Sequence, residues 1–424
     1  MPPVNAVLVG AGSRGRQTYG DWALRHPRRL RFVAVVEPDA SRRDRFGDLH
    51  GIPPGRRFGR LPDDAGDADA WVIAGPDRTH AEAALTAIGS GAAVLLEKPM
   101  AATARDCVEV VGAAADHDVL LRVSLVLRWT PFFQTVRDIV GSGDLGEVLD
   151  VAHRENVVAW HMAHSFVRGN WANAETSTPM AVQKTCHDFD IVSWVTGRSY
   201  DRLSSFGSLT HFRPDQAPPG ATSRCTDGCT VEDCPFDARR LYLDERLRGW
   251  PVDVITEDLG REARLAALRE GPYGRCVYAA GSDVVDHQST VAEMQGGTTV
   301  TLSMHGHAPR EERTMRYEGT RATLRGVFGR DQRIEVIDHV RGRTVDVPVP
   351  PARGGHGGGD EGLIASFVDA VVSGAGSTES TGDDVLEGHL AAFAAEAARR
   401  SGTVVEMEAF RMGVDGTSQQ VPGS

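Results

Sequence analysis

The sequence is poor in cysteine, in basic charge and in long apolar runs. Six cysteines among 424 residues are too few for a disulfide scaffold, so we expect a reducing compartment, the cytoplasm. With 58 acidic and 46 basic residues the net charge is −12, which argues against a nucleic-acid partner because phosphate binding needs a basic face. No apolar run approaches the roughly 18 residues that cross a membrane, so we expect no membrane partner.

The opening segment "MPPVNAVLVGAG" has no basic region and only a short apolar run, which argues against a signal peptide. The length and the 41% hydrophobic content are enough for a large core and suggest two or three domains.

A glycine turn follows the first apolar strand, Ala6 to Val9. The segment "GAGSRG" matches the pattern G-x-G-x-x-G. Its first glycine permits a tight turn, its second lets a pyrophosphate approach the backbone, and its third lets the next helix pack closely. Helix N-terminal amides then face the phosphates. The sequence therefore predicts a dinucleotide site formed by Gly10, Gly12, Ser13, Arg14 and Gly15.

Glu37 ends the second predicted strand, "RFVAVVEP", and lies 22 residues beyond Gly15. An acidic residue at about this spacing holds the ribose 2′-hydroxyl of NAD and disfavours the 2′-phosphate of NADP. Arg42 and Arg43 follow closely and leave NADP as the alternative. The sequence favours NAD.

Strands and helices continue to alternate through the first 126 residues. Apolar strand-like runs cover 67–75, 92–99 and 119–126, and helical runs cover 80–91 and 104–118. Such alternation indicates an α/β domain with a parallel, doubly wound sheet, in which ligands lie at the carboxyl ends of the strands. The segments "GPDRTH" and "EKP" both follow a predicted strand and are expected at that edge.

Several motifs together resemble one known family. "GAGSRG", "GPDRTHAEAAL" and "EKPMAAT", then "RWTPFFQTVRDIVGSGDLGEV" and "HDFDIVSWVTG", are similar in type and order to the glucose-fructose oxidoreductase, inositol dehydrogenase and MocA-type (Gfo/Idh/MocA) family. The resemblance covers nearly the whole chain. It implies an NAD-binding Rossmann domain (1–126) and a substrate-binding and oligomerisation α+β domain (127–412). The terminal segment "DGTSQQVPGS" itself predicts a disordered tail, 413–424.

The same resemblance implies site residues. Lys98 of the EKP motif and His187 of the later segment would face the nicotinamide as catalytic residues. Cofactor contacts are expected from Pro76, His80, Glu97 and Lys98, and a substrate contact from Arg128. The family often has D-x-G-x-H before the histidine, whereas this chain has Gln183 and Thr185 in place of the aspartate and glycine. Lys184 lies beside this change and is a further catalytic candidate.

The chemistry of "VQKTCHDFDIVSW" supports that role for His187. Thr185 and Asp188 form a [ST]-x-x-[DE] capping pattern, and Ile191 follows His187 on the same helix face. At a helix start the imidazole is favoured in its neutral form, which can accept a proton from a substrate hydroxyl, and a nearby Lys98 would stabilise the alkoxide. The alternative is a core histidine, with Lys184 on the surface and with Asp188 and Asp190 as cap and structural partners.

Two other segments offer substrate contacts. "WHMAHSFVRGNW" has neither helical nor strand periodicity and is predicted to be a loop, with His164, Arg168 and Trp171 facing a sugar; the alternative is an ordinary packed loop. "HGGGDEG" precedes a helix that Asp360 is expected to cap, and His356 on its glycine loop is expected to reach the pocket.

Three cysteines lie within ten residues of a segment predicted to be an insertion, about 213–275. "RCTDGCTVEDCPF" supplies Cys225, Cys229 and Cys234, and Cys276 is the best distant fourth ligand. Thiolates so grouped suggest a structural zinc, although the spacing is not a standard one and does not exclude an iron–sulfur cluster. The alternative is reduced surface thiols. Cys107 and Cys186 are expected to be buried apolar side chains.

The second domain contains strand-like runs with alternating faces, at 204–212, 286–295, 298–307, 314–328 and 333–340. They predict one open, mostly antiparallel sheet. The family resemblance implies that the free face of this sheet forms a homodimer or homotetramer.

Three functions remain open from the sequence. The first is an NAD-dependent oxidoreductase that acts on a secondary hydroxyl of a sugar, glycoside or cyclitol. The second is an NAD-dependent glycosidase that works by transient oxidation, elimination and water addition. The third is a non-catalytic NAD-binding regulator, against which the presence of both Lys98 and His187 argues.

Overall fold

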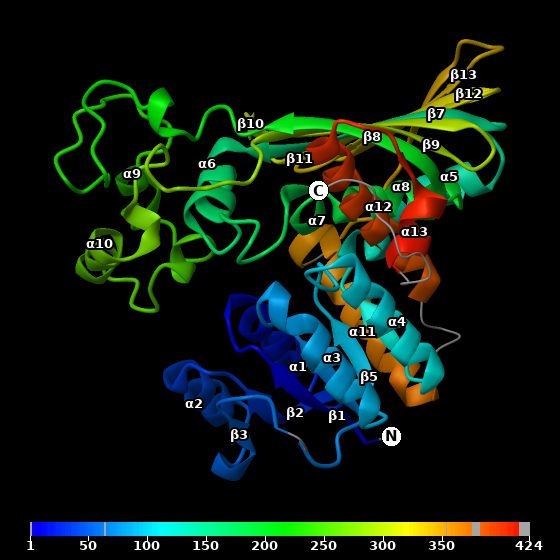
Figure 1. Ribbon diagram of the computed structural model, residues 1–424. Helices are drawn as coiled ribbons and strands as arrows, with labels where there is room; N and C mark the ends of the chain where they lie inside the picture. Colours follow the sequence, from blue (N-terminus) through cyan, green and yellow to red (C-terminus); the bar gives the residue numbers. More distant parts are fainter. Residues whose placement is uncertain (1, 63–64, 353, 375–381, 415–424) are drawn as a thin grey trace.

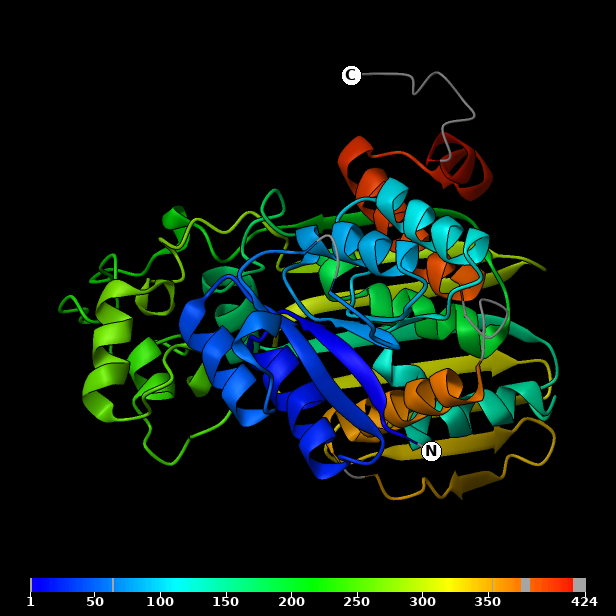
Figure 2. The ribbon, with the colours of Figure 1, turned by 90° about the horizontal axis from the view of Figure 1, so that it is seen from below.

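The structure is a computed structural model that describes residues 2–62, 65–352, 354–374 and 382–414. The chain forms two β-sheets: the first lies between helices, and the second is an outer layer with helices on one side (Figure 1). A loop-rich insertion projects to one side, next to the first sheet (Figures 1 and 2).

The first sheet has six strands, all parallel, in the order β3-β2-β1-β4-β5-β6. The strands are β1 (Val4–Val9), β2 (Leu30–Val36), β3 (Arg57–Phe58), β4 (Ala70–Ile73), β5 (Ala93–Leu96) and β6 (Leu121–Val123). Alternate residues of β1 enter different cores, since Ala6 and Leu8 pack on one side and Val7 and Val9 on the other. A sheet buried on both faces is what parallel strands require, and the doubly wound prediction is confirmed.

Helices cover both faces of this sheet. On one face lie the π-helix η1 (Arg14–Gly20), α1 (Asp21–Arg25), α2 (Ala40–Leu49) and α11 (Gly359–Ser373); on the other lie α3 (His80–Gly89) and α4 (Ala104–Asp116). Helix α11 comes from far along the chain. Its residues Leu363, Ile364 and Phe367 are buried in the same core as Val4 and Leu8 of β1.

The second sheet has nine strands in the order β14-β13-β12-β11-β7-β10-β9-β8-β15. These are β7 (Val148–Val158), β8 (Tyr200–Ser208), β9 (His287–Met294), β10 (Thr298–Ala308), β11 (Glu312–Gly319), β12 (Ala322–Phe328), β13 (Arg333–Asp338), β14 (Thr344–Val347) and β15 (Val405–Glu406). All pairs are antiparallel except β7 with β10, so the mostly antiparallel prediction is confirmed.

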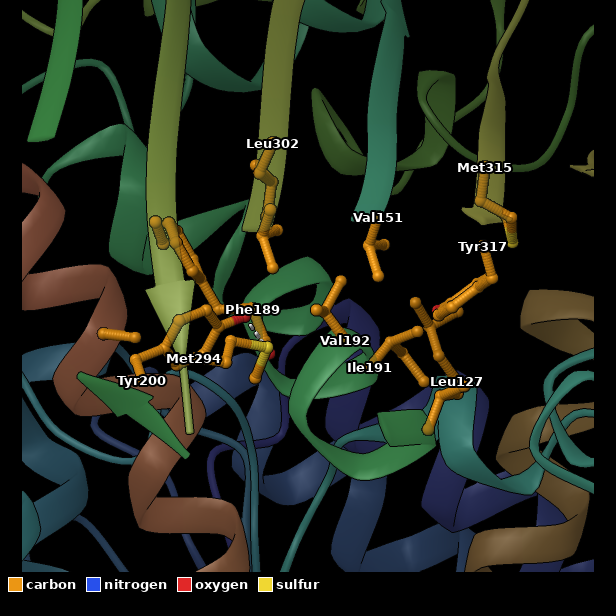
Figure 3. Packing of buried hydrophobic residues seen from close by; sticks show 14 of the residues in the cluster. Leu127, Val151, Phe189, Ile191, Val192, Tyr200, Met294, Leu302, Met315 and Tyr317 are labelled. Atoms are coloured by element: carbon orange, nitrogen blue, oxygen red, sulfur yellow. Dashed lines mark hydrogen bonds between the residues drawn. The ribbon is translucent and has the colours of Figure 1, made fainter. Parts of the chain in front are cut away.

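One face of the second sheet packs on helices α5 (Pro131–Gly141), α8 (Cys186–Thr196) and α12 (Gly382–Ser401). Figure 3 shows Val192 of α8 directed at Val151 of β7 and Leu302 of β10, with Phe189 on one side near Met294 and Ile191 on the other side near Leu127. This contact fixes α8 firmly against the sheet. The start of the helix carries the titratable residues singled out in the sequence.

The segment 160–171 is largely helical, so the loop prediction is wrong. Helices α6 (Ala159–His161) and η5 (Met162–Arg168) cover most of it, and every residue of η5 is buried. The insertion runs between β8 and β9 and contains α9 (Ala238–Tyr242) and α10 (Arg261–Glu270). It has its own small core, which includes Tyr242, Val252 and Leu268.

The remaining helices are short or terminal. They are η2 (Pro54–Arg56), η3 (Asp77–Thr79), η4 (Val126–Trp129), α7 (Met180–Gln183), η6 (Pro214–Gln216), η7 (Val252–Val254), η8 (Pro272–Gly274), η9 (Gly355–Gly358) and α13 (Met407–Val414). Most of the predicted tail, residues 415–424, lies outside the described residues. Among the described helices, none combines the length and the apolar character needed to cross a bilayer.

Candidate active site

The glycine turn leaves room for a dinucleotide. Gly10 has φ +90°, and a Cβ there would lie 2.6 Å from the backbone nitrogen of Gly75. A Cβ on Gly15 would collide with the carbonyl of Gly10. A Cβ on Gly12, by contrast, would meet no atom within 4 Å. The turn is therefore closed on its protein side and open at Gly12, as a backbone cradle for a pyrophosphate requires.

Glu37 is buried beside this turn at the end of β2. Its carboxylate accepts hydrogen bonds from the backbone N–H groups of Ala11, at 2.8 Å, and Asp39, at 3.0 Å. These bonds orient the carboxylate at the carboxyl edge of the sheet, where a ribose would lie. Arg43 is already engaged, since its guanidinium donates to the carbonyl oxygen of Glu37 at 2.8 Å.

Arg14 and Glu97 bind each other and hold the glycine helix to the EKP loop. The Arg14 guanidinium pairs with Glu97 and, at 2.8 Å, with Asp360 of α11. The hydroxyl of Tyr19 donates to Glu97 at 2.5 Å. Burial raises the pKa of Glu97, but Arg14 outweighs it and the net pKa is lowered, so the carboxylate stays charged. Both residues thus bind each other and position the turn.

His80 joins the two loops at the carboxyl edge of the first sheet. Its Nδ1 lies 2.8 Å from the carbonyl oxygen of Pro99, and its Nε2 lies 3.0 Å from that of Gly75. Pro76, next to Gly75, is exposed at the same edge. The two loops that the sequence placed at this edge are therefore fixed to each other.

Lys98 crosses from the first domain to the start of α8. Its Nζ donates to the carbonyl oxygen of Gln183 at 2.8 Å. Burial lowers the pKa of Lys98, and the neighbouring Lys184 ammonium lowers it further, against the opposing effect of nearby acidic groups. Trp171 lies on the other side, with its ring centre 5.9 Å from Nζ. The indole N–H of Trp171 donates to Asp77 at 3.4 Å.

His187 is buried in the first turn of α8, close enough to Lys98 for the lysine's positive charge to affect the pKa of the imidazole. Burial lowers the pKa of His187 well below its ordinary value, and Lys98, Arg313 and His356 lower it further. Its Nδ1 has no hydrogen-bond partner among the described residues. A neutral imidazole with an unpartnered buried nitrogen, beside a lysine, is equipped to take up a proton from a bound hydroxyl.

Lys184 is not a surface residue. Its ammonium pairs with Glu155 of β7 at 2.9 Å and with Glu311 at 3.2 Å. Burial lowers the pKa of Lys184, but the two carboxylates raise it above its ordinary value. Lys184 therefore remains a fixed positive charge next to Lys98 and His187.

The predicted capping box is absent. Thr185 is the N-cap residue of α8, but its hydroxyl donates to the carbonyl oxygen of Ala181 at 3.0 Å and makes no cap bond. Asp188 accepts from His153 Nε2 at 2.8 Å and from Arg313 Nε at 2.7 Å. Although burial raises it, these partners lower the pKa of Asp188 to about 2.

A buried charge network thus lies under the start of α8. It joins Glu155 and His153 of β7, Arg313 of β11, Glu311, and Lys184 and Asp188. Glu155, Arg313 and Glu311 are not among the residues predicted from the sequence, because only the packing of β7 and β11 against the start of α8 brings them together. For Glu155 a local signal was its position among the apolar residues of "VLDVAHRENVV".

Three predicted substrate residues bind protein groups elsewhere. Arg128 pairs with Asp190 inside the core, through Nε and Oδ2 at 2.8 Å. Arg168 donates to the carbonyl oxygens of Arg275 at 2.7 Å and Phe236 at 2.6 Å. His164 bonds to Tyr242 of the insertion at 2.7 Å, and burial lowers its pKa to about 3. These residues shape the surroundings of the site and are not brought to Lys98.

His356 has φ +48° and is about half exposed, on a loop before α11. Its Nδ1 lies 2.9 Å from Asp360 Oδ2. Its interaction with His187 lowers the pKa of that imidazole. Asp360 makes no cap bond; it binds Arg14 and His356 instead. The loop therefore connects the glycine turn to the neighbourhood of His187.

The four predicted metal-binding cysteines, Cys225, Cys229, Cys234 and Cys276, line one small cavity. Within the described residues, however, no three histidine, cysteine, aspartate or glutamate side chains are close enough together to hold a metal ion. The side-chain spacing therefore does not support the zinc expectation. Cys107 and Cys186 are buried, as predicted.

Comparisons with known proteins cover nearly the whole chain. Residues 4–125 match the NAD-binding Rossmann domain of the GFO_IDH_MocA oxidoreductase family, and residues 137–407 match its C-terminal α/β domain. The Bacillus subtilis protein YteT, which is named as a putative oxidoreductase, is 26% identical over 316 residues, which are 70% of this chain and 71% of the relative.

Inositol 2-dehydrogenase 4 from Saccharopolyspora erythraea is 32% identical over 221 residues, 51% of this chain and 60% of that protein, so less than two thirds of its length is matched. The crystal structure of an aldose-aldose oxidoreductase from Caulobacter crescentus is 14% identical, with a TM-score of 0.67, and the superposition covers 95% of this chain and 99% of that one. At such low identity the likeness concerns the fold alone.

Proposed function

Because the chain belongs to the Gfo/Idh/MocA oxidoreductase family, we propose that it transfers a hydride between a secondary hydroxyl of a sugar, glycoside or cyclitol and NAD. The observation that carries the proposal is the meeting of Lys98, from the cofactor domain, with the start of α8, where His187 is buried and neutral.

The glycine turn and Glu37 fit a dinucleotide. Gly10, Gly12 and Gly15 would cradle its pyrophosphate, and Glu37 would hold its adenosine ribose. When bound, the nicotinamide supplies the hydride acceptor. His80 and the Arg14–Glu97 pair keep the surrounding loops in place.

Lys98 and His187 divide the proton chemistry. His187 takes the proton of the reacting hydroxyl on its neutral imidazole. The Lys98 ammonium orients that hydroxyl and stabilises the negative charge that develops on its oxygen. Lys184, held charged by Glu155 and Glu311, supports the low pKa of both groups.

The substrate class rests on relatives. The matched protein from Saccharopolyspora erythraea is named for a cyclitol, and the structural neighbour from Caulobacter crescentus is named for aldoses. Both names describe polyols with secondary hydroxyl groups.

The second candidate is an NAD-dependent glycosidase, which needs additional proton transfers after the oxidation. The observation that favours it is a further buried carboxyl group next to the site: Glu155 pairs with Lys184 at 2.9 Å. A single assay separates the two candidates. Purified protein is mixed with NAD and a panel of cyclitols, sugars and nitrophenyl glycosides, while NADH absorbance and nitrophenol release are followed together.

Accumulation of NADH supports the oxidoreductase. Release of nitrophenol without net NADH supports the glycosidase. Neither signal from any polyol, with NAD binding intact, would contradict both candidates.

We also propose that copies of the chain associate through the outer face of the second sheet. Figure 1 shows helices along only one side of this sheet. Phe206 of β8 and Val291 of β9 are 70% and 53% exposed on the other side. Large apolar side chains on an open sheet face are typical of a contact surface.

A further inference from the structure

Four of the six cysteines face one enclosed space in the insertion. Cys225, Cys229, Cys234 and Cys276 line a cavity of about 10 Å³, all as free thiols. A space of this size holds about one water-sized sphere. Lys98 and His187 are not among its lining residues. The cavity is thus separate from the active site, and its volume corresponds to that of one ion.

Backbone pairing brings the distant cysteine into place. The N–H of Cys225 donates to the carbonyl oxygen of Gly274 at 2.9 Å, and the N–H of Cys276 donates to that of Ser223 at 2.9 Å. The two segments form a short antiparallel bridge between Arg224 and Arg275. Two of the four thiols are therefore held by main-chain bonds, independently of what fills the cavity.

A backbone hydrogen-bond donor points at one of the four sulfurs. Cys225 Sγ accepts from the backbone N–H of Ala238 at 3.4 Å. Neutral thiols are weak acceptors, whereas such bonds stabilise thiolates that bind a metal.

A buried cation completes these surroundings. Arg168 is 4% exposed, and its Nη2 lies 3.7 Å from Cys225 Sγ. Its other bonds, to the carbonyl oxygens of Arg275 and Phe236, fix it between the two cysteine segments. A guanidinium in this position offsets part of the negative charge that a four-thiolate metal site carries.

We propose that the four cysteines bind one thiophilic metal ion of the Zn²⁺ type in a tetrahedral thiolate site. In the described structure no three ligand side chains are at metal-binding distances. The sulfurs must therefore move inward to about 2.3 Å from the ion. Each thiol releases its proton to solvent as its sulfur bonds to the metal, and no electron is transferred.

The ion would brace the insertion, which also contacts the cofactor domain. Arg45 of α2 pairs with Glu257 of the insertion at 2.8 Å, and Gln17 of η1 bonds to Asp253. The insertion is poor in regular structure, and its own apolar core is small. A metal that joins its two cysteine segments would stabilise this region without taking part in hydride transfer.

The test begins with the full-length wild-type protein, purified without added metal and analysed for metals and for acid-labile sulfide. We expect one zinc ion per chain and no sulfide. After removal of the metal, Co²⁺ should bind with the same stoichiometry and give the sulfur-to-cobalt charge-transfer band and the visible bands of a tetrahedral thiolate site. Metal-free protein that takes up neither Zn²⁺ nor Co²⁺ stoichiometrically would overturn the proposal, and so would iron with sulfide.

Variants locate the site. Cys229→Ser and Cys276→Ser should each weaken Zn²⁺ binding by about tenfold or more. Cys107→Ala, which removes a buried thiol from the first domain, is the matched control and should bind Zn²⁺ like the wild type. NAD binding, measured in parallel, shows that each variant is folded. Equal Zn²⁺ affinity in all three folded variants would refute this location, and the wild-type Co²⁺ spectrum remains decisive if a cysteine variant fails to fold.

Discussion

At the scale of single residues, burial and charge act in the same direction on His187. Removal from water disfavours the imidazolium, and the positive charges of Lys98 and Arg313 disfavour it again. The folded protein therefore keeps this imidazole neutral at pH values where a solvent-exposed histidine would already be protonated. Lys98 keeps its role because Gln183 offers only a carbonyl dipole to its ammonium, which leaves the ammonium able to bind an oxyanion.

Replacement of His187 by alanine should lower turnover by about 10²–10⁴, the range for loss of a positioned general base. Lys98→Met keeps the aliphatic stem, removes the charge and should have a similar effect through loss of alkoxide stabilisation. Steady-state rates with NAD and the best polyol measure both, and NAD affinity should change little.

Lys184→Met is the matched lysine variant. It should affect turnover less than Lys98→Met, because its ammonium is bound to Glu155 and Glu311. An equal loss of turnover in the two variants would mean that Lys184 also takes part in the proton transfer. If His187→Ala kept more than about a tenth of wild-type turnover, the base would have to be another residue.

Glu37 should make the protein prefer NAD to NADP, because a 2′-phosphate would face its fixed carboxylate. Glu37→Ala should lower the ratio of the dissociation constant for NADP to that for NAD by about tenfold or more. Fluorescence titration with both reduced cofactors measures the ratio, and Arg42→Ala tests the alternative. Wild-type protein that binds NADP as tightly as NAD would show that Arg42 or Arg43 decides the choice.

At the scale of helices and strands, the sequence was informative where patterns are local. The glycine turn, Glu37 and the EKP loop each follow an apolar strand, and all lie at the expected edge. The start of α8 was also located correctly, at Thr185.

Other features depend on contacts between distant segments and could not be predicted. Asp188 does not cap its helix, because Arg313 and His153 from two strands compete for its carboxylate. The sequence predicts a loop at helix η5, because this helix is buried on all sides and has no amphipathic period. The sequence does not predict the strand β7, because His153 and Glu155 occupy buried positions where apolar residues would mark a strand, and they pair with charges on other elements.

Helix α12 is tied to the EKP loop through a neutral histidine. His389 Nε2 accepts from the backbone N–H of Met100 at 3.0 Å, and its Nδ1 donates to the carbonyl oxygen of Val385 at 2.9 Å. Burial is the main cause that lowers the pKa of His389 to about 4. Protonation would place an N–H group against the N–H of Met100 and break this link.

Stability should therefore fall on acidification. Above about pH 6.5 neither folded nor unfolded His389 is protonated; below it the unfolded chain binds the proton first, so the free energy of unfolding drops until about pH 4. His389 should contribute up to about 3 kcal/mol to this drop. Urea unfolding at several pH values measures how the free energy of unfolding depends on pH. This dependence should be shallower for His389→Gln than for the wild type. It should be unchanged for His117→Gln, a substitution at an exposed position. Identical curves for wild type and His389→Gln would contradict the assignment.

At the scale of the whole molecule, the two sheets differ in what covers them. The first is enclosed by helices on both faces, whereas the second leaves one face uncovered in the described chain. Ser289 and Ser303 bridge neighbouring strands on that face, and Phe206 stands beside them in the pairing of β8 with β9. A second copy of the chain that packs on this face would cover both the apolar Phe206 and the polar Ser289 and Ser303.

Sedimentation of the wild-type protein should give a multiple of the 45.6 kDa chain mass. Phe206→Arg places a charge on the open face and should shift the mass toward that of a single chain. Val340→Arg, at a 90% exposed position in the turn after β13, is the matched control and should leave the mass unchanged. A wild-type protein that sediments as one chain would exclude this association.

The position of α11 has a consequence for how the chain acquires its structure during translation. The core beneath β1 is completed by Leu363, Ile364 and Phe367, so one side of the cofactor domain stays exposed until these residues leave the ribosome. A truncated gene product that ends at residue 126 would present that apolar surface to solvent. We therefore expect the core of the nucleotide-binding unit to be completed only after α11 has been synthesised, so that this late segment contributes to the stability of the first domain.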